Sequence, residues 1–224
     1  RRHRPRRVPL AAFAAPPVAA LLADVVARRA NLLVSGATSA GKTTLLAALL
    51  AHAAPADRLV VIEDTTELEL PGRHAVRLEA LRPIADPIQP VDLSALVRAA
   101  LRLRPDRLVV GEFRGDEVLA VVQALNTGHD GSLSTCHANS ALDALRRVET
   151  LVLAAAPAWP LRAIRRHVSR CLDMVVHVAR RPDGSRRVVE VAEVVECDDE
   201  PTTRTLALDD TVIAQPGRVR STRQ

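Results

Sequence analysis

The clearest chemical signal in the sequence is the stretch GATSAGKT at residues 36–43, which fits the pattern G-x-x-x-x-G-K-[ST] at every fixed position. The two fixed glycines permit backbone conformations that other residues resist, so the N–H groups of such a loop can turn inward around phosphate oxygens. In this pattern Lys42 reaches the β- and γ-phosphates, and the hydroxyl of Thr43 coordinates Mg²⁺. A chance match is the alternative, but a strand pattern precedes the stretch and a helix pattern follows it, as the motif requires.

Lys42 is the only lysine among 31 basic residues. The sequence is also rich in Ala and Pro, as expected if a compositional bias replaces Lys by Arg wherever Arg will serve. A compact ammonium fits between two phosphate groups in a way that a planar guanidinium does not. We therefore predict a site for ATP with Mg²⁺. The predicted nucleotide-binding residues are Gly36, Ala37, Thr38, Ser39, Ala40, Gly41, Lys42, Thr43 and Thr44.

Hydrolysis needs more than a phosphate loop, because a water must be positioned and developing charge must be stabilised. Glu63, Asp64 and Glu67 follow the second buried-strand pattern, and Glu112 follows the third. One carboxylate beside the terminal phosphate can orient or deprotonate water, and another can hold Mg²⁺ through water. Each acid alone could instead cap a helix or lie in a solvated turn. For Asp64 that explanation is equally good, whereas the place of Glu112 after a buried strand favours function.

Two histidines, His129 and His137, bracket the fourth strand pattern in the segment NTGHDGSLSTCHANS at 126–140. An isolated histidine is more often a surface or core residue than part of a site. Here the end of the strand should lie near the terminal phosphate, so both imidazoles could sense that phosphate by hydrogen bonding. Zinc is the competing interpretation, but no partner at ligand spacing accompanies the histidines, and the three cysteines form no C-x-x-C pair.

The elements that must position these residues alternate between short apolar runs and helical patterns, which is typical of a parallel sheet covered on both faces. The four predicted buried strands are 31–35, 58–63, 107–111 and 131–136, and a further short strand is predicted at 74–78. The predicted helices are 17–29, 43–52, 93–103, 116–125 and 141–153, with a Pro-rich loop at 83–90. Acidic or polar clusters follow the strands at their carboxyl ends, where ligands bind in such sheets.

The character of the sequence changes past residue 158. A basic amphipathic helix is predicted at 161–172, followed by strands at 174–179 and 187–195 with a turn at 182–184, and a polar, weakly patterned tail at 198–224. We predict three parts: a basic linker and leading helix (1–30), a nucleotide-binding core (31–158), and a C-terminal helix, β-hairpin and tail (159–224).

Composition narrows the classes of function. Aromatic residues make up only 1% of the 224 residues, which argues against stacking platforms for single-stranded nucleic acid. The net charge of +5 is concentrated in the arginines of residues 1–7, which could be a solvated tail or could contact anionic lipid, nucleic acid or nucleotide phosphates. Scattered cysteines fit a reduced, cytoplasmic compartment. The apolar stretch 8–26 contains Pro16, Pro17 and Asp24, so no transmembrane segment is expected.

Four ordered blocks together resemble the secretion ATPases of type II and type IV systems, and within them the CpaF-like motors of tight-adherence (Flp) pilus assembly. The blocks are GATSAGKTT (36–44), VIEDTTEL (61–68), RLRPDRLVVGEFRGDE (102–117) and NTGHDGSLSTCHANS (126–140). The resemblance covers about residues 8–195. It implies an α/β fold with a RecA-like P-loop core and mostly parallel sheet, to which the C-terminal helix and hairpin form a small appendage.

The resemblance also implies roles. Glu67 matches the general base, Glu112 matches the atypical Walker B acid that holds Mg²⁺ through water, and His129 and His137 match the family's histidine block. Arginines that approach the phosphates or support the site would be Arg77, Arg102, Arg114 and Arg147, although a surface ion pair is the alternative for each. The candidate catalytic residues are thus Lys42, Glu63, Glu67, Glu112, His129, His137, Arg102 and Arg147.

The family further implies a homo-hexameric ring that hydrolyses Mg-ATP and pushes on an inner-membrane platform protein to export or polymerise pilin-like subunits. Such a protein is cytoplasmic and peripheral at the inner face of the cytoplasmic membrane. The family's amino-terminal domain has no match in this sequence, and the arm 1–7 resembles the end of its linker. A missing tetracysteine zinc module favours the CpaF-like branch. Two alternatives stay open: a nucleic-acid-dependent RecA-like translocase, and a non-catalytic nucleotide-binding ring scaffold.

Overall fold

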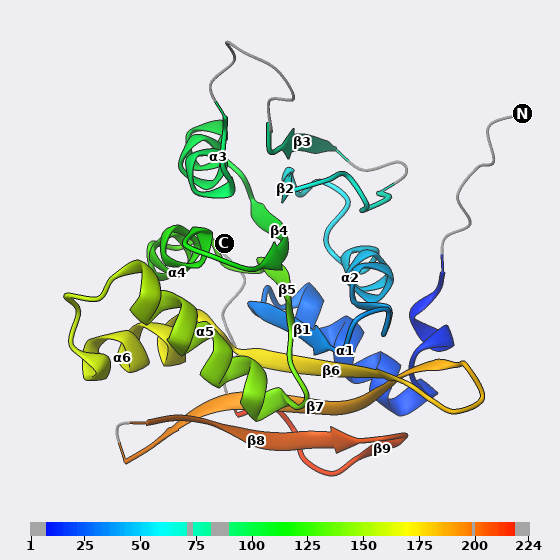
Figure 1. Ribbon diagram of the computed structural model, residues 1–224. Helices are drawn as coiled ribbons and strands as arrows, with labels where there is room; N and C mark the ends of the chain where they lie inside the picture. The colour runs from blue at the N-terminus through cyan, green and yellow to red at the C-terminus, as the bar shows by residue number, and fades with distance from the viewer. Residues whose placement is uncertain (1–7, 71–73, 82–89, 199, 218–224) are drawn as a thin grey trace, which may run out of the picture.

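The computed structural model describes residues 8–70, 74–81, 90–198 and 200–217, which fold around one nine-stranded sheet (Figure 1). The strand order is β3-β2-β4-β5-β1-β6-β7-β8-β9. The six strands from β3 to β6 are mutually parallel, and β7, β8 and β9 continue the sheet in antiparallel fashion. The mostly parallel α/β fold predicted from the sequence is therefore confirmed.

The strands are β1 Leu32–Gly36, β2 Leu59–Glu63, β3 Ala75–Glu79, β4 Arg107–Phe113, β5 Leu133–His137, β6 Met174–Arg180, β7 Arg186–Cys197, β8 Glu200–Leu208 and β9 Thr211–Val212. The α-helices are α1 Pro16–Ala27, α2 Lys42–Leu50, α3 Leu93–Ala100, α4 Glu117–Asn126, α5 Ala141–Ala155 and α6 Leu161–Cys171. Two 3-10 turns, η1 Leu10–Ala12 and η2 Leu101–Leu103, complete the described elements.

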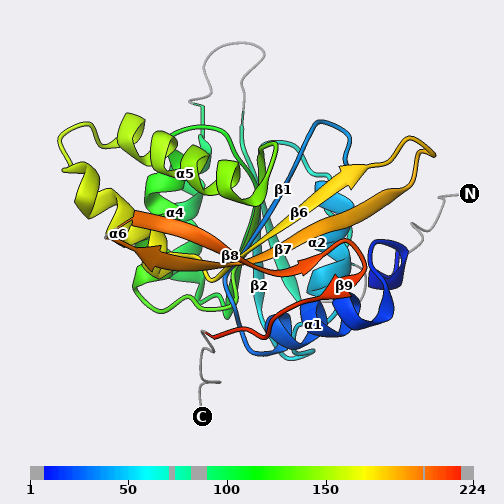
Figure 2. The same ribbon diagram turned by 90° about the horizontal axis from the view of Figure 1, so that it is seen from below.

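Helices cover both faces of the sheet, with α1 and α2 on one side and α3 to α6 on the other (Figures 1 and 2). Alternating side chains of each central strand serve these two cores: Leu32 and Val34 of β1 pack with α1 and α2, whereas Leu33 packs with the opposite helices. Burial on both faces explains why the strands read as continuous apolar runs in the sequence.

Local sequence sets where several helices begin. The side chain of Asp92 accepts a hydrogen bond from the backbone N–H of Ala95 at the start of α3, and Ser140 does the same for Asp143 in α5. These side chains satisfy N–H groups that have no partner within the helix. Prolines open α1, where their missing N–H is harmless. None of the helices among the described residues combines the length and the apolar character that a membrane crossing needs.

The C-terminal part differs from the prediction in its extent. The predicted helix and hairpin are present as α6, β6 and β7, but β6 pairs directly with β1, so the hairpin extends the core sheet. The tail predicted as weakly patterned contains β8 and β9. Strand β8 carries threonines and an arginine on its partly exposed positions, which hides the apolar alternation that predicts a strand. The division into three parts stays a prediction. The arginines of arm 1–7 and nearly all of the Pro-rich loop lie outside the described residues.

Candidate nucleotide site

The phosphate-loop motif lies between a buried strand and a helix, as its pattern requires. Strand β1 ends at Gly36 and helix α2 begins at Lys42. Between them Gly41 has φ 96° and Ser39 has φ 61°. The Gly41 value lies in the left-handed region that favours glycine. The Lys42 side chain is 8% exposed, and its Nζ donates to the carbonyl oxygens of Gly36 and Ala37, each at 3.1 Å. The ammonium thus lies across the loop that carries it.

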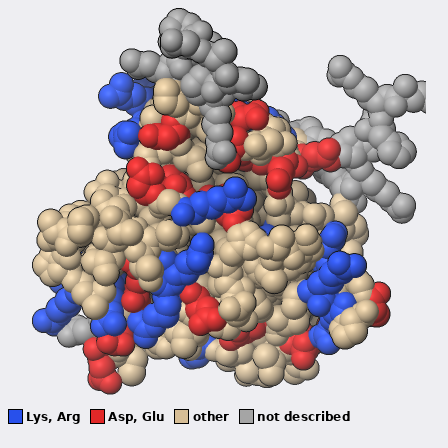
Figure 3. Space-filling model, in the orientation of Figure 1, with Lys and Arg blue, Asp and Glu red and all other residues tan. Residues whose placement is uncertain are grey.

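A chain of polar contacts connects Lys42 to the ends of β5 and β4. Its Nζ lies 3.3 Å from Nδ1 of His137, and Nε2 of His137 lies 2.8 Å from Oε1 of Glu112. The other oxygen of Glu112 accepts a hydrogen bond of 2.6 Å from Nη2 of Arg114. Because β5 and β4 run parallel to β1, their carboxyl ends meet at the same edge of the sheet as the phosphate loop. Side chains of both charges lie close together on this face, over the ends of β2 and β4 (Figure 3).

A second contact connects the loop to the segment that follows β2. The hydroxyl of Thr43 donates to Oε2 of Glu67 at 3.3 Å. The Glu63 carboxylate, which is 5% exposed, accepts hydrogen bonds from the backbone N–H groups of Glu67 (3.0 Å) and Leu68 (2.8 Å). Arg77 supports the same turn, because its Nη1 donates to the carbonyl of Leu68 and lies 3.9 Å from Glu63. Glu63 therefore holds the backbone that places Glu67 beside the phosphate loop.

Burial and neighbouring charges alter the titration of this cluster. Burial lowers the pKa of the Lys42 ammonium, an effect that the negative charge of Glu112 partly offsets. Burial also lowers the pKa of His137, again against the influence of Glu112. The hydrogen bond to Glu112 raises the pKa of Arg114. At neutral pH the cluster therefore holds a neutral imidazole between a cation and an anion. A neutral imidazole can accept a proton at one nitrogen and donate one at the other.

Comparison with known proteins identifies the family of the chain. The model of the family described as "Type II/IV secretion system protein" matches residues 11–214. The chain belongs to this family. It is 41% identical over 166 residues to the type IV secretion system protein PtlH of Bordetella pertussis, covering 71% of this chain and 49% of that protein. It is 38% identical over 179 residues to the conjugal transfer protein TrbB of Rhizobium radiobacter, covering 79% of this chain and 52% of that protein.

Solved structures of secretion ATPases share the fold. The VirB11 ATPase of the Brucella suis type IV secretion system, crystallised with sulphate, superimposes with a TM-score of 0.71 at 32% identity, covering 79% of this chain and 52% of that one. The pilus retraction motor PilT superimposes with a TM-score of 0.62 at 20% identity, which shows the shared fold alone. The chain spans about half the length of the relatives it matches. The comparisons place the chain in the broad family and do not distinguish a CpaF-like branch within it.

Two residues predicted to belong to the site, His129 and Arg102, do not reach the phosphate loop. His129 lies before β5, where its Nδ1 is 3.1 Å from the carbonyl of Ala124 at the end of α4. A five-residue strand, roughly 17 Å long, separates it from the end of the sheet that carries His137. Arg102 is exposed in η2, which precedes β4 and so lies at the same amino edge. Within one copy of the chain, neither side chain joins the phosphate-loop cluster.

Arg147 is intermediate between these cases. It is exposed on α5, and its charge contributes to lowering the pKa of His137. It also opposes the burial that raises the pKa of Cys136 to about 12. Arg147 thus lies within electrostatic range of the cluster without a contact to Lys42 or Glu112.

One part of the site escaped prediction: the β6–β7 hairpin packs on both fixed glycines. A Cβ on Gly36 would lie 2.3 Å from the carbonyl oxygen of Val178, and a Cβ on Gly41 would lie 2.6 Å from Cδ of Arg186. At Gly36 the contacting atom is backbone and leaves no room for a side chain, whereas at Gly41 the Arg186 side chain would have to shift. The motif shows only that glycines are needed, and the contacting residues lie more than 130 positions further along the sequence.

The donors around the loop suit Mg²⁺, which prefers oxygen ligands and keeps several waters. Thr43 supplies a hydroxyl, and the carboxylates of Glu67 and Glu112 lie on either side of the cluster. Among the residues that the structure describes, no group of three or more His, Cys, Asp or Glu side chains is arranged to hold a metal ion. A magnesium ion here would therefore depend on phosphate oxygens as well as on the protein, as is usual at nucleotide sites.

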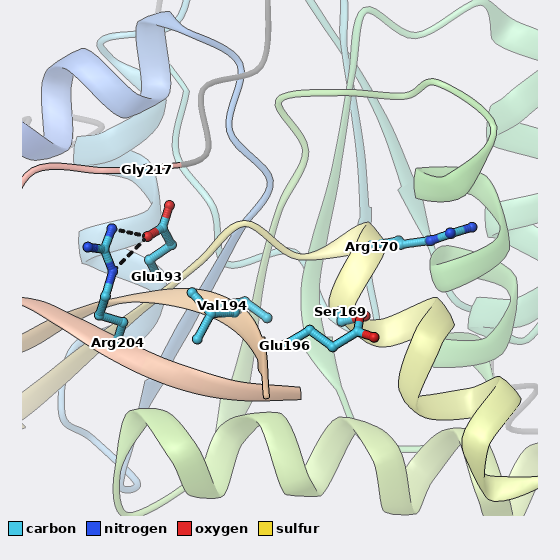
Figure 4. Close-up of a pocket in the computed structure, with 8 residues that line it drawn as sticks. Ser169, Arg170, Glu193, Val194, Glu196, Arg204 and Gly217 are labelled. Atoms are coloured by element: carbon cyan, nitrogen blue, oxygen red, sulfur yellow. Dashed lines mark hydrogen bonds and ion pairs between the residues drawn. The ribbon is translucent and has the colours of Figure 1, made fainter. Parts of the chain in front are cut away.

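A separate cavity of about 590 Å³ lies between the end of α6 and strands β7 and β8 (Figure 4). The Arg204 guanidinium beside it pairs with the buried carboxylate of Glu193 at 2.5 Å. Glu193 pairs in register with Met174, the first residue of β6. The cavity therefore belongs to the amino edge of the parallel strands and is distinct from the phosphate-loop site.

Proposed function

We propose that this chain is the nucleotide-hydrolysing core of a secretion or pilus-assembly motor, which couples Mg-ATP hydrolysis to the export or polymerisation of pilin-like subunits. The observation that supports this most strongly is the convergence at one sheet edge. Lys42 and Thr43 of the loop contact His137 and Glu67 directly, and His137 contacts Glu112. A loop that only bound nucleotide would need no general base such as Glu67.

In the proposed mechanism, Lys42 leaves the carbonyls of Gly36 and Ala37 and donates to the β- and γ-phosphate oxygens. Thr43 and, through water, Glu112 would hold Mg²⁺, which would supply positive charge to neutralise the phosphates. Glu67 orients a water and accepts its proton as the water oxygen bonds to the γ-phosphorus, while the bond from that phosphorus to the β–γ bridging oxygen breaks and ADP leaves. His137 lies between the terminal phosphate and Glu112 and contacts both.

Arg114 has a supporting role in this mechanism. Its guanidinium pairs with Glu112 at 2.6 Å and lies 3.9 Å from Asp64. It therefore fixes the direction of the Glu112 carboxylate. Glu63 acts in a similar way on Glu67 through the backbone of the turn. These are positioning residues, because neither side chain contacts the phosphate loop.

We propose a homo-hexameric ring at the inner face of the cytoplasmic membrane, acting on a platform protein of the same system. This proposal is supported by the secretion and transfer systems named for the relatives. His129, Arg102 and Arg147 are candidates for contact with a neighbouring copy, since their side chains are not engaged at the phosphate loop of their own chain.

Two substitutions test the proposed function. Lys42→Ala removes the only ammonium at the loop, and we expect it to abolish ATP binding. Glu67→Gln keeps the shape of the side chain but removes its basicity. We expect it to bind ATP with unchanged affinity and to lower phosphate release by about 100-fold or more. Binding and phosphate release are measured separately on the same preparations. Normal hydrolysis by the Glu67→Gln variant would show that the base is assigned wrongly.

A further assay separates this function from the alternatives. The ATPase rate is measured with and without single-stranded DNA, and we expect no stimulation. Strong stimulation would favour a nucleic-acid translocase. ATP binding without phosphate release from an assembled ring would favour a non-catalytic scaffold.

A further inference from the structure

The β6–β7 hairpin carries arginines whose contacts differ in kind. Arg181 pairs with Asp209 at 2.5 Å, and Arg187 pairs with Asp210 at 2.7 Å. Arg186 instead lies against the phosphate loop. A Cβ built on Gly41 would be 2.6 Å from its Cδ and 3.4 Å from its Nε. Within the part of the chain that the structure describes, no carboxylate pairs with this exposed guanidinium. Among the described residues, Arg186 is thus a cation without an ion-pair partner beside a predicted anion site.

The sheet fixes the position of Arg186. Strand β6 pairs with β1 up to Ser35, the residue before the loop, and Arg186 pairs with Arg180 in the hairpin. The turn between them is closed by backbone hydrogen bonds from Arg181 to Ser185 and from Gly184 to Arg181. Asp183 accepts two further hydrogen bonds from Ser185. The turn therefore fixes the backbone from which the Arg186 side chain extends.

Strand order shows which part of a nucleotide this guanidinium meets. On one side of β1 lie β5, β4 and β2, whose ends carry His137, Glu112 and Glu67. On the other side lie β6 and β7 with Arg186. Phosphates held in the loop therefore have the hydrolytic groups on one flank and Arg186 on the opposite flank. The bond to be broken belongs to the first flank, so Arg186 faces the rest of the nucleotide.

We propose that Arg186 is a nucleotide-binding residue that contacts the non-hydrolysed end of the polyphosphate, at the α-phosphate. The inference rests on the proposed nucleotide site. A guanidinium presents two parallel N–H groups to phosphate oxygens, and charge-assisted hydrogen bonds of this kind are the stronger class. The positive φ of Gly41 favours glycine there, and a Cβ at this position would also displace the Arg186 side chain from the loop.

The contact is the same before and during hydrolysis, because it lies away from the reacting phosphorus. Such uniform binding lowers KM without changing kcat. We therefore expect Arg186→Ala to weaken binding of both Mg-ATP and ADP by about tenfold, the effect of one charge-assisted hydrogen bond. We expect kcat to stay within about twofold of its original value, and Arg186→Lys to recover part of the affinity.

The test compares Arg186→Ala with Arg181→Ala, a matched control on the same hairpin whose arginine pairs with Asp209. Dissociation constants for Mg-ATP and ADP are measured by calorimetry on the 224-residue chain, and melting temperatures check that each variant folds. Weaker binding of both nucleotides by Arg186→Ala alone supports the proposal. Equal affinities in the two variants overturn it, and so does a loss confined to ATP. If the unchanged chain binds no nucleotide, the proposed function falls and this inference falls with it.

Discussion

The two edges of the parallel sheet use the same types of charged residue in opposite ways. At the amino edge, Arg107 is 1% exposed, and its Nε donates to Asp57 at 2.5 Å while its Nη1 donates to the carbonyl of Gly131. Arg29 bonds the other oxygen of Asp57 at 3.0 Å. At the carboxyl edge, the side chain of Arg114 is 59% exposed.

The two edges differ in whether their cations pair with carboxylates of the protein. Burial alone would raise the pKa of Asp57, but hydrogen bonds and charge from Arg107 and Arg29 hold that pKa below its usual range. Both arginines at this edge thus donate to a carboxylate within the protein, although Nε of Arg29 has no partner among the described residues. At the carboxyl edge Lys42 donates only to neutral partners, the loop carbonyls and an imidazole. The amino edge, where charged groups pair with one another, stabilises the fold. The carboxyl edge, where a cation donates to neutral partners, can bind an anion, and we call it the open edge.

The largest expected effect comes from breaking the ion pairs of the amino edge. Asp57→Ala leaves Arg107 buried without its carboxylate, which we expect to lower the free energy of unfolding by about 3–5 kcal/mol. Nucleotide affinity of the folded fraction should not change. Urea unfolding and nucleotide titration measure the two quantities. Asp24→Ala is the matched control, because its exposed pair with Arg28 contributes little. Similar stability losses in both variants would contradict the comparison.

Glu112→Gln at the open edge should have the reverse profile. It removes the charge between His137 and Arg114, and we expect turnover to fall by about 100-fold, or roughly 2.7 kcal/mol in the activation free energy. The free energy of unfolding should change by less than about 1 kcal/mol, because the contacts are partly exposed. Phosphate release and urea unfolding are measured on one preparation. A large stability loss with normal turnover would assign Glu112 a structural role.

The smallest effect concerns His177, a buried residue whose hydrogen bond with Ser35 lies near the open edge. It is 8% exposed, and its Nδ1 lies 2.9 Å from the hydroxyl of Ser35. Burial lowers its pKa, although the charge of Glu190 opposes this. The unfolded chain therefore binds a proton more readily than the folded one. We expect this contribution to stability to be present above pH 6.5, the unfolded value, and to be lost as the pH falls towards the folded value.

Replacing His177 tests this dependence. Melting temperatures of the original chain and of His177→Asn are compared between pH 8 and pH 5. We expect the decline on acidification to be smaller in the variant. An identical pH profile in both proteins would show that His177 does not titrate between these states.

Much of the fold could be predicted because short apolar runs alternate with helical patterns in the sequence. The five predicted strands and their helices lie within a few residues of their predicted bounds, since β1, β2, β4 and β5 are largely buried on both faces. Strands β8 and β9 escaped because exposed polar positions obscure a short antiparallel pattern. The Asp57–Arg107 pair joins residues 50 positions apart, and no spacing rule predicts it.

The site was predictable to the extent that parallel strands bring their carboxyl ends together. That rule places Glu67, Glu112 and His137 beside Lys42. The same rule separates His129 from them, because two residues that bracket one strand lie at its opposite ends. Arg186 could not be predicted, since its place depends on the pairing of β6 with β1.

A crystal structure of the chain with Mg²⁺ and a non-hydrolysable ATP analogue is the most direct test of the open edge. We predict that Lys42 Nζ leaves the carbonyls of Gly36 and Ala37 and lies within about 3.2 Å of β- and γ-phosphate oxygens. Glu67 should lie within hydrogen-bonding distance, about 3 Å, of a water in line with the γ-phosphate. An analogue bound away from the loop, or Glu67 and Glu112 turned away from the terminal phosphate, would contradict the account.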